Sequence, residues 1–303
     1  MTSTPLAAPT DLAAAKPSTA EVAKKKLSSP LASVAVLVIA VFWTLPTFGL
    51  LVSSFRPERA IKRTGWWTFF SDPTVTMDNY KAVFGAEGGI NMGDFFVNAL
   101  VICIPAVLIP MSLAALAAYA FAWIEFRGKN MLFLMIFALQ VVPLQVTLLP
   151  LLKLFVQLHL SGTFWTLWLA HSTFALPLAI YLLHNFMREI PTTLIEAARV
   201  DGAGHVSIFF RVMLPLLTPA LAAFGIFQFL WVWNDLLVAL VFAGGGNSVA
   251  PITLALANLS GSRGTAWQLL SAGAFVSIVV PVTVFLLLQR YFVRGLMAGS
   301  VKG

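Results

Sequence analysis

The sequence predicts an all-α integral membrane protein with six transmembrane helices and both termini in the cytoplasm. Of its 303 residues, 59% are hydrophobic and only 10% are charged, whereas soluble proteins carry about 25% charged residues. The charges are also clustered, and Lys, Arg, Asp and Glu are all absent from residues 27–55, 95–124, 130–152, 154–187, 212–234, 236–262 and 264–289. A membrane-spanning helix needs about 20 mostly apolar residues. This composition excludes a soluble enzyme, a nucleic-acid-binding domain and a disordered module.

The first 29 residues are rich in Ala, Pro, Ser, Thr and Lys and are predicted to form a disordered cytoplasmic tail. The apolar run that follows extends from about Leu31 to Val52, which is longer than the roughly 7 to 15 apolar residues of a cleaved signal peptide. We therefore predict an uncleaved first transmembrane helix over residues 30–54.

The six transmembrane helices are expected at about 31–53, 96–122, 131–154, 163–185, 216–241 and 267–289. With the N-terminus inside, more Lys and Arg residues fall on the inner side than on the outer side, as the positive-inside rule requires. Residues 55–94 then form an external segment, and residues 95–303 a core with five transmembrane helices. The uncharged run over residues 236–262 is interrupted at Gly244–Ser248 and Pro251, so it is not one span and its remainder is predicted as an external loop.

Aromatic residues gather in the external segment at Trp66, Trp67, Phe69 and Phe70, close to Lys62 and Arg63. Aromatic rings beside basic residues are typical of a segment that lies at the membrane surface. Contact with a partner protein is the alternative interpretation.

A polar connection from Met187 to Pro215 separates the fourth and fifth predicted spans. It is predicted to form a short helix, a turn and a second helix. Thr193 and Glu196 have the spacing of a capping box, and Gly202 stands where the end of a helix commonly requires a positive φ. A small charged helix of this kind is suited to lying in a cleft of another protein.

Several motifs in this connection hold a fixed spacing. They are Glu196-Ala197-Ala198, Gly202 and Leu214-Pro215. They resemble the EAA loop of binding-protein-dependent ABC importer permeases. Further matches extend over nearly the whole chain, at Asp78-Asn79-Tyr80, Asn98, Phe126–Lys129, Trp233–Asp235 and Ser300–Gly303. Together they resemble the smaller, maltose-type permease subunit of sugar importers, related to the alpha-glucoside transporters.

The resemblance implies a type I ABC importer permease fold in the bacterial inner membrane, and a non-catalytic, multi-pass subunit that forms half of a sugar path. The implied partners are a second permease subunit, two ATP-binding cassette ATPase subunits, an external sugar-binding protein, the sugar and membrane lipid, with no nucleic acid. The coupling loop 187–215 would dock the ATPase through Glu196, Ala197, Ala198, Arg199, Asp201, Gly202, Leu214 and Pro215.

Polar residues inside the predicted spans are candidates for the sugar path. Gln228, Trp231 and Asp235 share one helix face, and could offer a sugar a ring to stack on and groups to bond its hydroxyls. Alternatively, Asp235 caps a neighbouring helix end and Trp231 belongs to an aromatic belt. Gln140 and Gln145 lie in a proline-containing span that either lines a cavity or packs against other helices.

The sequence lacks the motifs of a metal site, of a nucleotide-binding loop and of two other classes of membrane protein. The four histidines lack the close spacing of a metal site, and no phosphate-binding loop occurs, so no metal and no cofactor are expected. An ion-coupled secondary transporter of a small polar solute is the alternative function; it would be expected to show internal repeats and ionisable groups at mid-membrane. An intramembrane enzyme would need a nucleophile with its base or clustered metal ligands.

Overall fold

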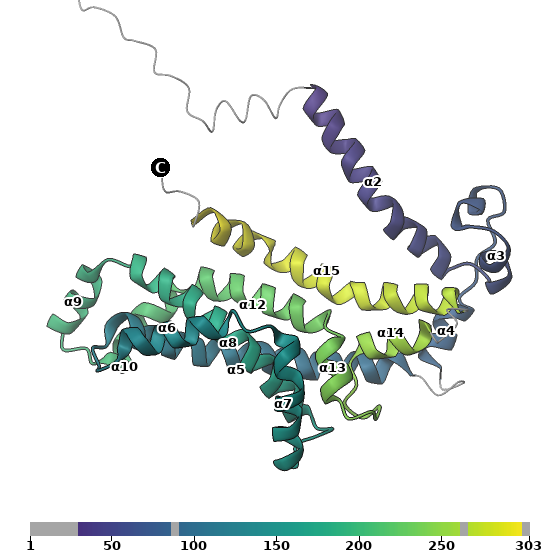
Figure 1. Cartoon of the computed structure of the whole chain (residues 1–303). Helices are drawn as coiled ribbons and strands as arrows, with labels where there is room; N and C mark the ends of the chain where they lie inside the picture. The colour runs from purple at the N-terminus through teal and green to yellow at the C-terminus, as the bar shows by residue number, and fades with distance from the viewer. Residues whose placement is uncertain (1–29, 86–90, 261–265, 299–303) are drawn as a thin grey trace, which may run out of the picture. The chain divides into compact units, whose positions relative to one another are not determined.

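The computed structural model describes residues 30–85, 91–260 and 266–298, which form helices and connecting turns and contain no strand (Figure 1). The predicted tail over residues 1–29 lies outside the described residues, as does the Ser300–Gly303 motif. The chain divides into two compact units, residues 1–50 and 51–303.

Four helices are long and apolar enough to cross a membrane: α2 (Pro30–Ser54), α5 (Met92–Trp123), α8 (Phe164–Glu189) and α15 (Trp267–Ala298). The other helices are α3 (Glu58–Arg63), η1 (Trp66–Phe70), α4 (Asp78–Phe84), α6 (Lys129–Leu139), α7 (Leu144–Gln157), α9 (Thr192–Val200), α10 (His205–Ile208), the π-helical turn η2 (Phe209–Met213), α11 (Leu214–Leu216), α12 (Thr218–Trp233), α13 (Leu237–Phe242) and α14 (Ile252–Ser260).

The first span agrees closely with the predicted helix over residues 30–54. Helix α2 contains no charged residue, and large apolar side chains such as Leu37, Phe42 and Trp43 are exposed along it. Because a helix surface made up of large apolar side chains is unfavourable in water, these residues are suited to contact with lipid.

The predicted third span, residues 131–154, is divided in two. Helices α6 and α7 meet at an angle of 101° across the break at residues 140–143. Pro143 precedes α7, and a proline both lacks an N–H donor and disfavours a helical conformation in the residue before it. The pair counts as one bent span or as a re-entrant segment.

The predicted fifth span, residues 216–241, also differs. Residues His205–Leu216 meet α12 at 70°, and α12 ends at Trp233, before the separate helix α13. The amide of Asn234 donates to the carbonyl oxygen of Leu230, and Asn and Asp side chains favour helix ends because they bond to nearby backbone groups. The structure therefore has four candidate spans, or up to six if each bent pair crosses once.

Part of the predicted external loop is helical as well, since residues Ile252–Ser260 form α14. The apolar residues of α14, such as Ile252 and Ala255, are buried. Short apolar segments next to glycines do not reveal from sequence alone whether they have neighbours to pack against, and here those neighbours are α5 and α15.

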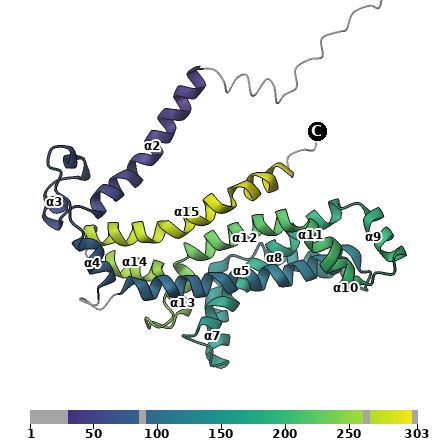
Figure 2. The ribbon, with the colours of Figure 1, turned by 180° about the vertical axis from the view of Figure 1, so that it is seen from behind.

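Within the second unit, α5 packs along α8 and α12, and α12 also packs against α15 (Figure 2). The face of α5 near its C-terminus carries Ala114, Ala115 and Ala118, all buried, and small residues allow the backbones of membrane helices to approach closely. The buried residues form two hydrophobic clusters. We call them the Trp233 cluster, which includes Met92, Ala106, Phe242 and Ile252, and the Met187 cluster, which includes Ala118, Ile195, Ile208 and Leu217.

The segment after α2 folds around the guanidinium of Arg56, which is only 1% exposed. Its Nη1 donates to the carbonyl oxygen of Gly65 and to Oγ1 of Thr68, at 3.0 and 2.7 Å. Trp67 and Phe70 point outward, at 64% and 73% exposed. These exposed rings are compatible with both predicted roles, anchoring at the membrane surface and contact with a partner.

Candidate functional site

The short helix α9 of the polar loop has one buried and one open face. Ile195 is 2% exposed and packs in the Met187 cluster, so it fixes the helix to the body of the protein. Glu196, Ala197 and Arg199 are exposed. The helix therefore offers a charged surface flattened by a small alanine side chain, as the sequence predicts.

The C-terminus of α9 follows the expected geometry. Gly202 has a φ of 81°, which confirms the predicted positive φ. The N–H of Gly202 donates to the carbonyl of Arg199 and the N–H of Ala203 to that of Ala198, both at 2.9 Å. These two bonds make a Schellman motif, which turns the chain sharply towards α10.

The N-terminus of α9 differs from the prediction. The residue that caps the helix is Pro191, and no side chain bonds to the first turn. Thr193 lies inside the helix, so the capping box with Glu196 is not formed. The reason is that the helix starts two residues earlier than a capping box at Thr193 would require, at Thr192, directly after the conformationally restricted Pro191.

Helix α10 is tied to α5 by a contact that the sequence did not suggest. The hydroxyl of Tyr119 lies 3.0 Å from Nδ1 of His205, and the Tyr119 ring also packs edge-on against Phe209. Beyond this contact the chain passes through η2 to Leu214 and Pro215. The loop is thus held to the body on both sides of Gly202, by Ile195 and by Tyr119.

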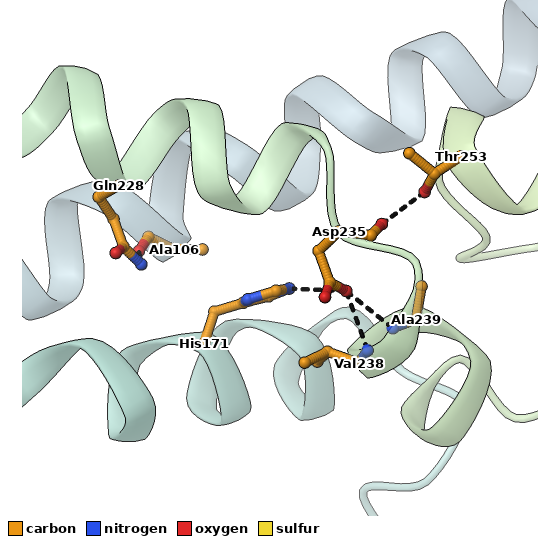
Figure 3. A network of polar contacts seen from close by, with 7 residues as sticks. All are labelled: Ala106, His171, Gln228, Asp235, Val238, Ala239 and Thr253. Atoms are coloured by element: carbon orange, nitrogen blue, oxygen red, sulfur yellow. Dashed lines mark hydrogen bonds and ion pairs between the residues drawn. The ribbon is translucent and has the colours of Figure 1, made fainter. Parts of the chain in front are cut away.

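Gln228 does not face an open path in this structure. It is 5% exposed, and its Nε2 donates to the carbonyl oxygen of Ala106 in α5 at 3.1 Å (Figure 3). Its neighbour on the same face, Trp231, is 37% exposed and packs edge-on against the ring of His171. The two residues share a face, as predicted, but only Trp231 has an accessible ring.

Asp235 lies in the turn between α12 and α13, because α12 ends at Trp233. The prediction that it shares a helix face with Gln228 and Trp231 was therefore wrong. Its Oδ2 accepts from the backbone N–H groups of Val238 and Ala239 at 3.0 and 3.2 Å, and its carbonyl accepts from the hydroxyl of Thr253 at 2.6 Å (Figure 3). Nε2 of His171 lies 3.9 Å away, which is too long for a hydrogen bond. Of the two predicted roles, the structure supports the cap of a neighbouring helix.

The space beside this carboxylate is small. A cavity of about 10 Å³ is lined by residues that include His171, Trp233, Asp235 and Pro251. That is room for about one water molecule. In this conformation a sugar does not fit beside Asp235.

We expect an Asp235→Ala variant to lose about 1 kcal/mol of stability, because the first N–H groups of α13 lose their acceptor. Asp235→Asn should stay close to the unmodified protein, since asparagine caps about as well as aspartate. Thermal unfolding in detergent measures both. Equal losses in the two variants would show that the negative charge matters rather than the cap.

Gln140 and Gln145 lie on either side of the bend between α6 and α7, and both side chains are exposed. They contribute no buried hydrogen bond between helices, which was the alternative prediction for them. Within the described residues, no group of three His, Cys, Asp or Glu side chains is placed to hold a metal ion.

An open cleft of about 640 Å³ lies at the start of α5, which the sequence did not indicate. It is lined by Asn91, Asp94, Phe95, Val97, Asn98, Asn247 and Ser248. The amide of Asn98 holds one wall by donating to the carbonyl oxygens of Ser248 and Ala250. Volumes of this order suit a small ligand, and the amides and the hydroxyl in the lining could bond a polar solute.

The chain is similar to permease proteins of bacterial import systems. Residues 111–297 match the family described as "Binding-protein-dependent transport system inner membrane component". Over 273 residues the chain is 54% identical to the osmoprotective compounds uptake permease protein GgtD of Synechocystis sp., covering 89% of this chain and 91% of the relative. It is 49% identical over 258 residues to the alpha-glucoside transport system permease protein AglG of Rhizobium meliloti, covering 84% and 67%.

Among solved structures, the chain resembles one from a bacterial ABC transporter involved in the import of the acidic polysaccharide alginate. The TM-score is 0.69 at 18% identity, covering 92% of this chain and 99% of the other. This likeness shows the type I ABC permease fold. The relatives are permease subunits, which are non-catalytic, and the chain is a multi-pass membrane protein. Because the family match spans more than half of its length, the chain belongs to the inner membrane components of binding-protein-dependent transport systems.

Proposed function

We propose that the chain is a permease subunit of an ATP-driven importer of a di- or oligosaccharide, with alpha-glucosides as the first class to test. It would form half of the translocation path beside a second permease subunit. The observation that carries the proposal is the loop at α9, where the exposed Glu196 and Ala197, backed by the half-buried Ala198, are followed by a glycine with a positive φ. The name of AglG, an alpha-glucoside transport permease, supports an alpha-glucoside as the solute, and the name of GgtD supports uptake of a small solute.

In this proposal the α9 loop couples the permease to one of two ATPase subunits. The exposed residues Glu196, Ala197, Arg199, Asp201 and Gly202 would contact the ATPase, with Ala198 half-buried behind them. Leu214 and Pro215 would join the loop to α12. Because Ile195 and the Tyr119–His205 contact anchor the loop, a displacement of α9 would be carried into the helices rather than absorbed by the connection.

For the topology, we propose that each bent pair of helices crosses the membrane once, which gives six spans with both termini in the cytoplasm. The loop 187–215 then lies inside, where the ATPases are. Residues 55–94 and the cleft at the start of α5 lie outside, on the side from which a binding protein delivers sugar.

A neutral solute suits the charges of this chain. The spans carry no Lys or Arg over residues 95–124, 154–187, 212–234 and 264–289, so these segments offer an acidic substrate no counter-charge. Trp231 could stack on a sugar ring, and Gln140 and Gln145 could bond hydroxyl groups. We propose that Gln228 and Asp235 support this path through their bonds to Ala106 and α13.

Reconstituted uptake tests the function. The chain is assembled with its second permease and ATPase subunits in vesicles, and the loaded binding protein is added outside with radiolabelled maltose or trehalose. Uptake is expected with ATP inside and not with a non-hydrolysable analogue. Uptake driven by an ion gradient without ATP would support the secondary transporter instead. A shift in the melting temperature of the binding protein shows which sugar to use.

A further inference from the structure

Prolines inside the long helices leave carbonyl groups without their helical partner. A proline has no N–H, so the carbonyl four residues earlier cannot accept its usual hydrogen bond. The prolines in question are Pro105 and Pro110 in α5 and Pro281 in α15. The freed carbonyls are those of Val101, Ala106 and Ser277.

Each of these carbonyls accepts a hydrogen bond from a side chain of another helix. Nε1 of Trp168 in α8 donates to Val101 at 2.9 Å. Nε2 of Gln228 in α12 donates to Ala106 at 3.1 Å. Nε1 of Trp233, also in α12, donates to Ser277 at 3.1 Å. The side-chain donors thus meet the backbone at the positions that proline chemistry leaves open.

Burial makes the loss of such a hydrogen bond costly. Gln228 and Trp233 are only 5% and 1% exposed, so two of the three freed carbonyls are reached by buried donors. A buried carbonyl without a partner is costly, and within a membrane the freed groups at prolines must be satisfied by neighbouring helices. Figure 3 shows Gln228 of α12 extended towards Ala106 of α5.

We infer that Trp168, Gln228 and Trp233 are positioning residues for transport: they fill the proline sites of α5 and α15 and tie α5, α8, α12 and α15 into one block. The inference rests on the proposed function for its role in transport, but the bonds themselves do not. When the α9 loop is displaced, the block moves as a unit, because separating α5 from α8, α5 from α12 or α12 from α15 would leave a freed carbonyl without its donor. Gln228 is then a support for the path and not a sugar ligand.

A double-mutant cycle tests the inference. In Gln228→Met the side chain keeps its length and loses its donor, and we expect sugar transported per ATP hydrolysed to fall about tenfold, since an unpaired buried carbonyl shifts an equilibrium by about that factor. The melting temperature of the assembled complex should fall as well. In a Pro110→Ala background residue 110 regains its N–H and can bond Ala106 within the helix. There the same Gln228→Met change should have little effect.

The two tryptophans give independent cycles. Trp168→Phe is combined with Pro105→Ala, and Trp233→Phe with Pro281→Ala. In each case the tryptophan substitution should have little effect once the proline has been replaced. Trp123→Phe is the matched control, because the indole N–H of Trp123 is buried without a hydrogen-bond partner among the described residues. Removing that donor should leave the melting temperature unchanged or slightly raised.

Two results of these experiments would contradict the inference. Additive losses in all three cycles, with no relief from the proline variants, would overturn the inference. So would a Gln228→Met variant that needs more sugar for half-maximal uptake in both backgrounds at an unchanged melting temperature, since that is how a sugar ligand behaves. If the complex moved no sugar at all, the melting temperatures would still decide whether the bonds exist, and the proposed function would fail separately.

Discussion

A Gly202→Val variant is expected to lose ATP-driven uptake by about tenfold or more, whereas Gly202→Asn should keep most of it. Gly202 has a φ of 81° and no atom within 4 Å of the position that a Cβ would take. A larger side chain therefore has room at this position, and the positive φ is what restricts the choice of residue. A β-branched residue is a severe outlier at positive φ, while asparagine adopts it readily. Uptake by the assembled transporter in vesicles, beside binding of the ATPase to the permease, measures the effect.

A charged residue at the same position examines the surface instead of the backbone. Aspartate also tolerates a positive φ, so Gly202→Asp keeps the turn but places a carboxylate where we propose that the ATPase docks. We expect ATPase assembly and sugar-stimulated hydrolysis to fall. If both survived, the coupling role of the α9 loop would be wrong. Equal activity of the valine and asparagine variants would show that the turn itself is not needed.

Gly244→Ala is expected to cause the largest loss of stability, roughly 2 to 5 kcal/mol, from the sum of backbone strain and overpacking. Gly244 has a φ of 75°, and an added Cβ would lie 2.7 Å from Cα and 3.2 Å from the backbone N of Gly162. Because both atoms belong to the backbone, no side-chain rotation relieves the clash. The two turns, one before α8 and one after α13, would have to separate.

The neighbouring glycine is a matched control. Gly245 has a φ of 74° and nothing within 4 Å of its added Cβ, so Gly245→Ala carries the strain without the clash. We expect it to cost about 1 to 2 kcal/mol. Thermal unfolding of the two variants in the same detergent gives the difference. If they unfolded at the same temperature, the close approach of the two turns would contribute nothing measurable.

Much of the candidate coupling site could be predicted because its signals are local. The turn at Gly202 depends on residues within one turn of helix, and the positive φ follows from the position of a glycine after the last helical residue. The capping box failed for an equally local reason, since α9 starts directly after Pro191, two residues before the start that a cap at Thr193 would give. A helix boundary from sequence is uncertain by a residue or two, which is enough to displace a cap.

The role of Gln228 could not be predicted in this way. Its partner Ala106 is 122 positions away in the chain, and a glutamine on a helix face is equally suited to a sugar hydroxyl or to a carbonyl. The decisive signal is Pro110, which opens the carbonyl of Ala106. That signal can be used only once α5 and α12 are known to pack together.

By itself the sequence determined the membrane environment, the polar loop that contains α9 and its glycine turn, because apolar length, charge spacing and backbone conformation are properties of the chain in one dimension. The tertiary structure alone decided that the predicted third span is bent by 101°, that the chain bends by 70° where α12 begins, and that Asp235 caps α13. It also decided which side chains fill the proline sites. These features arise from pairs of elements, and the free energy of an unpaired buried polar group depends on which neighbour meets it.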